Sequence, residues 1–268
     1  MLSRPARGVQ TAISALTLPK DMQQPFTEKY RPTRTTDIQG HNKAVEQVLS
    51  WVKNYSSQKK KGLLLHGAPG TGKTSIAQAI AAELGLELVE VNASDVRNKA
   101  SIKERVGASM QQMSLFGGGK LILFDEMDGL SGNKDRGGIQ EMTELLKTSA
   151  FPVILTANDP WDSKFKTLRK YVELIELRTL AYTSILSVLK RVCEEENIVY
   201  EEPALKQLAR QAGGDLRGAL TDLQTLGADG MVTMAELEAV GGRRQADSML
   251  NALMRILKGK DPVVARQA

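Results

Sequence analysis

The chain is organised around the stretch Gly62-Leu63-Leu64-Leu65-His66-Gly67-Ala68-Pro69-Gly70-Thr71-Gly72-Lys73-Thr74. A short apolar run, typical of a buried strand, leads into the pattern G-x-x-x-x-G-K-T, and a helix-forming segment at 75–84 follows at once. This order of strand, glycine-rich loop and helix predicts a phosphate-binding P-loop rather than a glycine-rich turn with an incidental Lys-Thr pair. We therefore expect the chain to bind a nucleoside triphosphate.

Each part of the loop has an expected role in that binding. The glycines let the backbone approach phosphates closely with N–H groups pointing inward, and the following helix adds the positive end of its dipole. Lys73 supplies a charge to the β- and γ-phosphates, and the hydroxyl of Thr74 is suited to ligating Mg²⁺. The predicted phosphate-binding residues are Gly67, Ala68, Pro69, Gly70, Thr71, Gly72, Lys73 and Thr74.

Length and composition are those of an ordinary globular protein. The 268 residues are 41% hydrophobic and 25% charged, which suits one large or two modest domains. No apolar run approaches the ~20 residues that a membrane span needs, so we expect no membrane partner. The single cysteine, Cys193, cannot form an intrachain disulfide and favours a reducing, intracellular setting, with a structural rather than a reactive thiol.

The amino-terminal part of the chain is basic. Residues 1–61 hold 11 Lys and Arg against 4 Asp and Glu, and local basic surface suits a polyanion partner. Residues 1–21 resemble a transit-like leader only weakly, because their apolar stretch is short and broken, and a disordered or loosely docked tail is the preferred interpretation.

Pro32 excludes a continuous helix before the P-loop. Helical spacing begins near Asn42, which we expect to cap that helix.

Beyond the P-loop, short strands alternate with helices. Together with the P-loop strand, about five strands are expected, the others at 86–91, 120–124, 152–155 and 172–177, with helices at 96–113 and 138–148. This alternation implies an α/β fold with a parallel sheet that is covered on both faces. From Leu180 onward the pattern is helical without strand runs, which predicts a small all-helical second domain. Asp215 is the expected cap of a helix at 216–226.

Two strand ends carry side chains suited to hydrolysis. Asp125 and Glu126 follow a buried strand; Asp125 would hold Mg²⁺, usually through water, and Glu126 would orient and polarise the attacking water. An exposed acidic turn is the alternative. Asn158 ends the strand expected beside the P-loop strand, so its amide could position the same water, although a turn residue is the alternative. Arg217, in the second domain, can reach the γ-phosphate or pair with a surface acid. With Lys73 these four make the predicted catalytic set.

Taken together, these motifs resemble AAA+ ATPases, and among them the clamp loaders. The segments that carry the resemblance are 26–32 before the P-loop, 91–95 after the second strand, and 213–224, the lid motif with its sensing arginine. The resemblance covers residues 25–257 and implies ATP and Mg²⁺ as cofactors, with the adenine cradled by Tyr30, Arg31, Pro32 and Ile38. It also implies these domains: a tail at 1–21, an AAA+ nucleotide-binding domain at 22–178, a helical lid at 179–242 and the start of a collar helix at 243–268.

Finer features resemble the large subunit of replication factor C, in its archaeal form. Residues 132–141 are similar to that subunit rather than to the small ones. Small subunits place Ser-Arg-Cys before the last strand, the arginine acting as a finger into a neighbouring site. Here Lys170-Tyr171-Val172 occupies that place, although Arg169 nearby could act in trans. Because the family's large subunit continues into a helical collar, we expect this chain to be a fragment, a split subunit or a shortened form.

The resemblance implies a mechanism and partners. An ATP-bound hetero-pentamer with small subunits opens a ring-shaped sliding clamp, grips primer–template DNA, and releases both on hydrolysis. DNA contacts would read phosphates at helix starts, here Arg97, Lys99, Gly138, Ile139 and Gln140. Arg97 also matches a basic residue proposed to restrain the catalytic glutamate until DNA binds. Clamp contacts would come from Met113, Leu115 and Phe116, unless these pack in the chain's own core. We expect a cytoplasmic, nucleoid-associated protein, or a nuclear one in a eukaryote, that is not secreted.

Two other functions compete with this interpretation. A nucleic-acid motor such as a branch-migration helicase would need an arginine finger, and the departure at 170–172 argues against it. A structural subunit that binds nucleotide without hydrolysing it is disfavoured by the intact Lys73, Asp125 and Glu126.

Overall fold

A computed structural model describes residues 24–93, 119–130 and 136–239 of the chain. Several sequence predictions lie outside this part: the tail at 1–21, the helix at 96–113, the carboxyl-terminal segment at 243–268, and the site residues Arg97, Lys99, Met113, Leu115 and Phe116.

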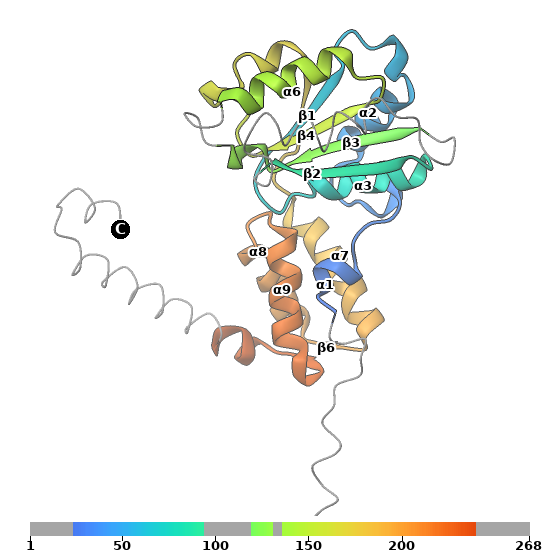
Figure 1. Cartoon of the computed structure of the whole chain (residues 1–268). Helices are drawn as coiled ribbons and strands as arrows, with labels where there is room; N and C mark the ends of the chain where they lie inside the picture. Colours follow the sequence, from blue (N-terminus) through green and yellow to red (C-terminus); the bar gives the residue numbers. More distant parts are fainter. Residues whose placement is uncertain (1–23, 94–118, 131–135, 240–268) are drawn as a thin grey trace, which may run out of the picture.

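A five-stranded parallel sheet forms the centre of the larger domain (Figure 1), as the sequence predicted. Its order is β2-β3-β4-β1-β5, with β1 (Gly62–His66), β2 (Glu87–Asn92), β3 (Lys120–Asp125), β4 (Val153–Ala157) and β5 (Val172–Glu176). Leu64 on β1 lies opposite Leu155 on β4 and Leu174 on β5. Because the strands are parallel, the carboxyl ends of β1, β4 and β3 meet at one edge of the sheet.

Helices cover both faces of the sheet. On one face α2 (Asn42–Lys53) and α3 (Lys73–Glu83) pack against Leu63 and Leu65, and on the other α6 (Arg136–Thr148) packs on the side of Leu64. Successive residues of β1 therefore enter opposite core layers, which explains why the strand is apolar throughout.

The start of α2 differs from the sequence prediction. Asn42 is the first helical residue, and the cap position belongs to His41, whose side chain makes no capping hydrogen bond. His41 is buried, so it packs into the domain instead of turning back to the helix end. Similarly, α6 begins at Arg136, two residues before the predicted start at Gly138.

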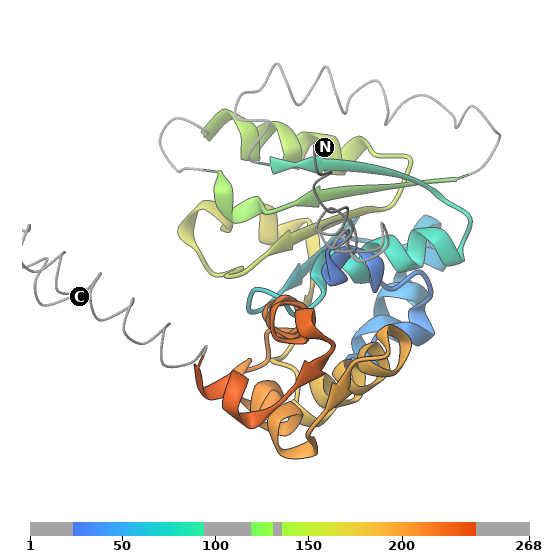
Figure 2. The ribbon, with the colours of Figure 1, turned by 90° about the horizontal axis from the view of Figure 1, so that it is seen from below.

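The lid lies at one end of the sheet, where α7 (Tyr182–Glu196), α8 (Glu202–Gln211) and α9 (Leu216–Leu226) gather (Figures 1 and 2). Their apolar faces share one core, in which Cys193 is buried, and burial raises the pKa of its thiol to about 11. Asp215 caps α9 as predicted, accepting a hydrogen bond from the Gly218 N–H at 2.9 Å.

The lid is not purely helical, which corrects the prediction of a domain without strands. The segments β6 (Val199–Tyr200) and β7 (Met231–Val232) form a short parallel pair. Two residues are too few to show the alternating pattern by which strands are recognised in a sequence, so this pair left no signal.

A segment before the sheet connects the two domains. Phe26, in α1 (Phe26–Lys29), is only 5% exposed within the lid core, and its N–H donates to Gln224 of α9 at 2.9 Å. A few residues later the chain has reached the other domain, where the Arg31 guanidinium donates to Gln78 of α3 at 3.2 Å. We call residues 26–35 the strap. Its first half packs with the lid although the sequence grouped it with the nucleotide-binding domain.

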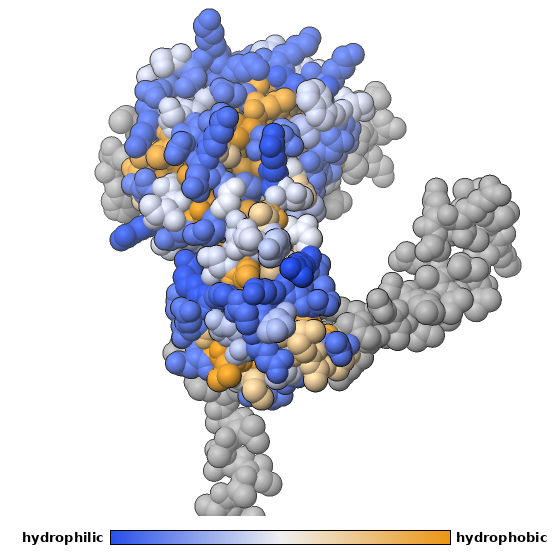
Figure 3. Space-filling model, turned by 180° about the vertical axis from the view of Figure 1, so that it is seen from behind, coloured by the Kyte–Doolittle hydropathy of each residue, from blue (hydrophilic) through white to orange (hydrophobic). Residues whose placement is uncertain are grey.

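The face of the molecule shown in Figure 3 is mostly hydrophilic in its described part. Trp161, 68% exposed, is the most exposed large apolar side chain among the described residues. Within the described ranges, none of the helices combines the length and apolar character needed to cross a membrane.

Candidate nucleotide-binding site

The loop at 67–72 joins β1 to α3 and has the backbone that a P-loop requires. Gly67 has φ +147°, and a Cβ there would lie 2.1 Å from the carbonyl oxygen of Leu177, so only glycine fits. Gly70 has φ +70°, and a Cβ there would lie 1.7 Å from a carboxylate oxygen of Asp215. The lid therefore lies directly against the loop, and the cap of α9 touches the place where phosphates are expected.

Lys73 directs its ammonium back into the loop. It donates to the carbonyl oxygens of Gly67 and Ala68 at 2.8 and 2.9 Å, and to Oδ1 of Asn158 at 2.9 Å. Asn158 follows β4, which pairs with β1, so the predicted neighbourhood of the two strand ends is confirmed. A cation held by loop carbonyls and one amide is in position to exchange these neutral partners for phosphate oxygens.

The charge of a lid residue, Arg217, acts on Lys73 of the P-loop. Burial lowers the pKa of Lys73, while the carboxylates of Asp128 and Asp125 raise it and the guanidinium of Arg217 lowers it further. Arg217 is exposed, so its charge is free to act on a bound anion. The structure thus brings together Lys73, Asp125, Asn158 and Arg217, which the sequence predicted as catalytic.

Thr74 and Asp125 fit a magnesium ion. The Thr74 hydroxyl lies 3.0 and 2.9 Å from the two carboxylate oxygens of Asp125. Hydroxyl and carboxylate oxygens are the ligands that Mg²⁺ prefers, and near phosphates this ion needs only one or two protein ligands.

Glu126 has an unusual backbone. It is one of two described non-glycine residues with positive φ, at +55°, a conformation that is uncommon outside turns and functional sites. Its N–H donates to the Thr156 hydroxyl at 3.0 Å, and the Asn92 amide donates to its carboxylate at 3.3 Å. Sequence analysis missed Asn92, although it ends β2 exactly opposite Asp125 on the neighbouring strand and could have been found from that register.

Asp128 is a second residue that sequence analysis missed. Its carboxylate accepts a hydrogen bond from the backbone N–H of Asn158 at 2.5 Å, while its carbonyl accepts from the Lys164 ammonium at 2.8 Å. The available signal was an acid two positions after Glu126, in the turn η6 (Met127–Gly129) that leaves the same strand end.

Family models match both domains. The one described as "ATPase family associated with various cellular activities (AAA)" matches residues 63–179, and "RCF1/5-like, AAA+ ATPase lid domain" matches 187–227. The chain is also 40%, 42% and 40% identical, over 242, 234 and 245 residues, to proteins named replication factor C large subunit from Thermofilum pendens, Methanococcus maripaludis and Nanoarchaeum equitans.

The chain therefore contains an AAA ATPase domain followed by a lid domain of the RCF1/5-like type, and it is similar to proteins named replication factor C large subunit. The three alignments cover 89%, 87% and 91% of this chain but only 59%, 48% and 57% of the relatives, so the chain spans about half of their length. Nucleotide binding follows from the AAA domain. A further model, "Parvovirus non-structural protein NS1", matches residues 7–101, a range that includes the same P-loop.

The residues predicted to cradle the adenine are divided between the two domains, since Tyr30 packs against the lid core and Arg31 reaches α3. The Tyr30 hydroxyl donates to Glu196 of α7 at 2.6 Å, and burial, followed by this hydrogen bond, raises the pKa of Tyr30. Pro32 is half-buried, and Ile38 is buried in the core with α2 and α3. Base binding by Tyr30, Arg31, Pro32 and Ile38 stays a prediction.

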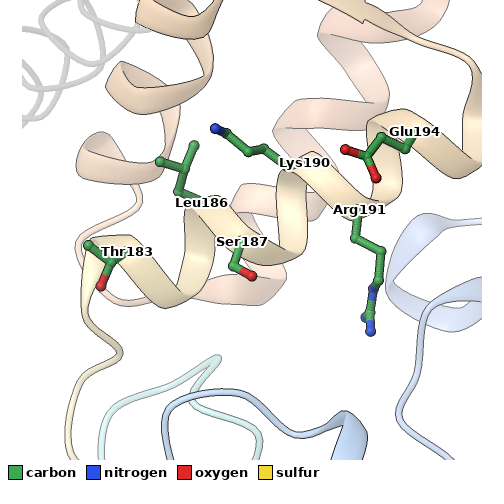
Figure 4. A pocket seen from close by; sticks show the side chains of 6 residues that line it. All are labelled: Thr183, Leu186, Ser187, Lys190, Arg191 and Glu194. Carbon is green, nitrogen blue, oxygen red and sulfur yellow. The ribbon is translucent and has the colours of Figure 1, made fainter.

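A shallow cavity of about 410 Å³ runs along α7 (Figure 4). Ser187 and Arg191 point to one side of the helix, and Leu186 and Lys190 to the other. No predicted site residue lines this cavity; its walls are Thr183, Leu186, Ser187, Lys190, Arg191 and Glu194.

Among the predicted DNA contacts, Ile139 and Gln140 lie in the described residues, and contact with DNA stays a prediction for both. The side chain of Ile139 is 8% exposed and packs in the core beneath α6, so only its backbone could meet DNA. Gln140 is exposed. The N–H groups of residues 136–138 belong to the first turn of α6, where no helical carbonyl can accept them, and they suit a phosphate.

Arg169, considered as a finger acting in trans, is engaged within its own chain. Its guanidinium donates to the carbonyls of Pro160 and Asp162 at 2.6 and 3.2 Å and lies 5.2 Å from the Trp161 ring centroid. These contacts give the side chain a structural role in the loop after β4.

Proposed function

We propose that this chain is the ATP-hydrolysing part of a clamp-loader large subunit. With replication factor C small subunits it would open a sliding clamp and load it onto primer–template DNA. The observation that carries the proposal is the convergence of Lys73, Asp125, Asn158 and Arg217 at one edge of the sheet. Support for the specific role comes from the similarity to proteins that are named replication factor C large subunit.

The proposed reaction is attack of water on the γ-phosphorus of ATP. As the water oxygen bonds to phosphorus, the bond to the β–γ bridging oxygen breaks, giving ADP and phosphate. Glu126 orients the water and accepts its proton, and Asn158 holds the water in line. Lys73 and Arg217 balance charge on the phosphates. Thr74 and Asp125 would hold Mg²⁺, which neutralises charge on the phosphate oxygens.

The partners occupy separate proposed surfaces. DNA phosphates would meet Arg97, Lys99 and the helix start at Gly138, Ile139 and Gln140, and the clamp would meet Met113, Leu115 and Phe116. A neighbouring small subunit would supply the arginine finger that completes the site. This function places the chain with the DNA, in the cytoplasm of a prokaryote or the nucleus of a eukaryote.

The test is the ATPase rate of this chain assembled with small subunits, with and without sliding clamp and primed DNA. We expect clamp plus DNA to raise the rate and Glu126→Gln to abolish the increase, because the amide cannot accept a proton. Glu173→Gln removes an exposed carboxylate from β5 and should leave the rate unchanged. A confirmed assembly that responds to neither ligand would refute clamp loading.

A further inference from the structure

Thr156 places one buried hydroxyl between the two acids of the site. The side chain, on β4, is 1% exposed. Its hydroxyl donates a short hydrogen bond to Oδ1 of Asp125 and accepts one from the N–H of Glu126 at 3.0 Å. A hydroxyl oxygen is suited to this place because it can donate one hydrogen bond and accept another.

The Thr156 hydroxyl lies where the backbone pairing between β3 and β4 ends. The ladder between β3 and β4 pairs Ile122 to Phe124 with Val153 to Leu155 and ends there. Asp125 and Thr156 are the next residues on each strand, so their side-chain hydrogen bond continues the contact between the strands. On its other side, the Asp125 carboxylate meets the Thr74 hydroxyl. The carboxylate is therefore fixed from both β4 and α3.

The second hydrogen bond holds the main chain of Glu126. A residue with φ +55° has left the extended strand, while its N–H still faces β4 and is accepted there by a side chain. The Thr156 hydroxyl receives that N–H, so one side chain supports the turn that carries the Glu126 carboxylate out of the strand and into the solvent-exposed site.

We propose that Thr156 is a positioning residue for ATP hydrolysis, which orients the Asp125 carboxylate and the main chain of Glu126 through a single hydroxyl. The inference rests on the proposed function. It predicts that removing the hydroxyl impairs turnover while the P-loop, whose own contacts do not include Thr156, continues to bind the nucleotide.

The test compares Thr156→Val, which keeps the branched shape without the hydroxyl, with Thr156→Ser, which keeps the hydroxyl. In the full assembly with clamp and DNA, we expect Thr156→Val to lower kcat by about 100-fold and Thr156→Ser to recover to within about fivefold of the parent. Thr143→Val is the matched control, because Thr143 is also buried and hydrogen-bonded, to the Ile139 carbonyl on α6 away from the site. It should keep the parental kcat.

A second readout needs no hydrolysis. A fluorescent ATP analogue is titrated onto the chain alone, with and without Mg²⁺. Without Mg²⁺, the affinity of Thr156→Val for the analogue should match that of the parent within about twofold. Mg²⁺ should raise the affinity of the parent and of Thr156→Ser, whereas Thr156→Val should lose most of this increase. If Thr156→Val fails to fold by circular dichroism, Thr156→Ala replaces it as the variant without a hydroxyl.

The outcomes separate the two proposals. A kcat for Thr156→Val within about threefold of the parent, equal losses in the Val and Ser variants, or the same loss in Thr143→Val would overturn the role of Thr156. Absence of ATPase activity in the parental assembly would instead overturn the proposed function. In that case the Mg²⁺ titration decides on Thr156 alone: equal affinities in all variants refute the positioning of Asp125, and the Val-specific loss supports it.

Discussion

Asp128 offers a sharp prediction because its carboxylate holds the backbone of Asn158 without belonging to the expected catalytic set. Its oxygen lies 2.5 Å from the Asn158 nitrogen, and hydrogen bonds to charged groups contribute about 1.5–3 kcal/mol. Both groups are reached by solvent, which favours the lower end, about 1.5 kcal/mol, or roughly a tenfold change in rate. Asp128→Ala should therefore lower kcat about tenfold, since Asn158 then positions the attacking water less well.

Paired variants make this prediction refutable. Asp128→Asn keeps an oxygen that can accept the Asn158 N–H but loses the charge, so we expect a loss of only about threefold. Asp159→Ala is the control, because Asp159 accepts the Trp161 N–H at 2.8 Å in the same loop without holding Asn158. The assay is steady-state ATPase of the assembled complex at saturating ATP. The reasoning fails if Asp128→Ala stays within about twofold of the parent, or if Asp159→Ala loses as much.

Three further predictions concern the lid and the P-loop. Phe26→Ala removes a buried ring from the lid core and should destabilise the lid by about 3–5 kcal/mol in urea unfolding, whereas an unchanged midpoint would show that the strap is not docked. Asp215→Ala removes the α9 cap and should cost about 1 kcal/mol in the same assay, with Asp215→Asn costing less; equal losses would argue against capping. ATP affinity should fall as pH rises toward the lowered pKa of Lys73, because phosphates bind the protonated ammonium. Lys73 of the unfolded chain keeps its proton to higher pH, so between the folded and unfolded pKa values the free energy of unfolding should rise with pH. An ATP affinity that is independent of pH in titrations would contradict the role of Lys73 in phosphate binding.

Local chemistry made much of the site predictable from sequence. The glycines of the P-loop, the acids after β3 and the cap at Asp215 each leave a signal within a few residues. The prediction that Asn158 ends a strand beside β1 is confirmed by the pairing of β1 with β4.

What the sequence could not show depends on side chains that meet across strands or domains. The hydroxyl of Thr156 acquires its two partners only because β3 and β4 are neighbours in space. Phe26 looks like any apolar residue in its segment, and nothing local indicates that it belongs to a core whose other buried residues lie between Leu180 and Leu237. The backbone of Glu126 follows from the turn geometry at the end of β3 and not from its own preference.

The strap has a mechanical consequence. The covalent chain passes between the domains at two places, once within residues 26–35 and again between Leu177, which is buried under the sheet, and Leu180, which is buried in the lid. Two covalent connections limit how far the lid can move from the larger domain. They therefore keep Arg217, on α9, in the neighbourhood of Lys73. Cutting the chain within the strap would leave only the connection at 177–180 and would remove this limit on the movement of the lid.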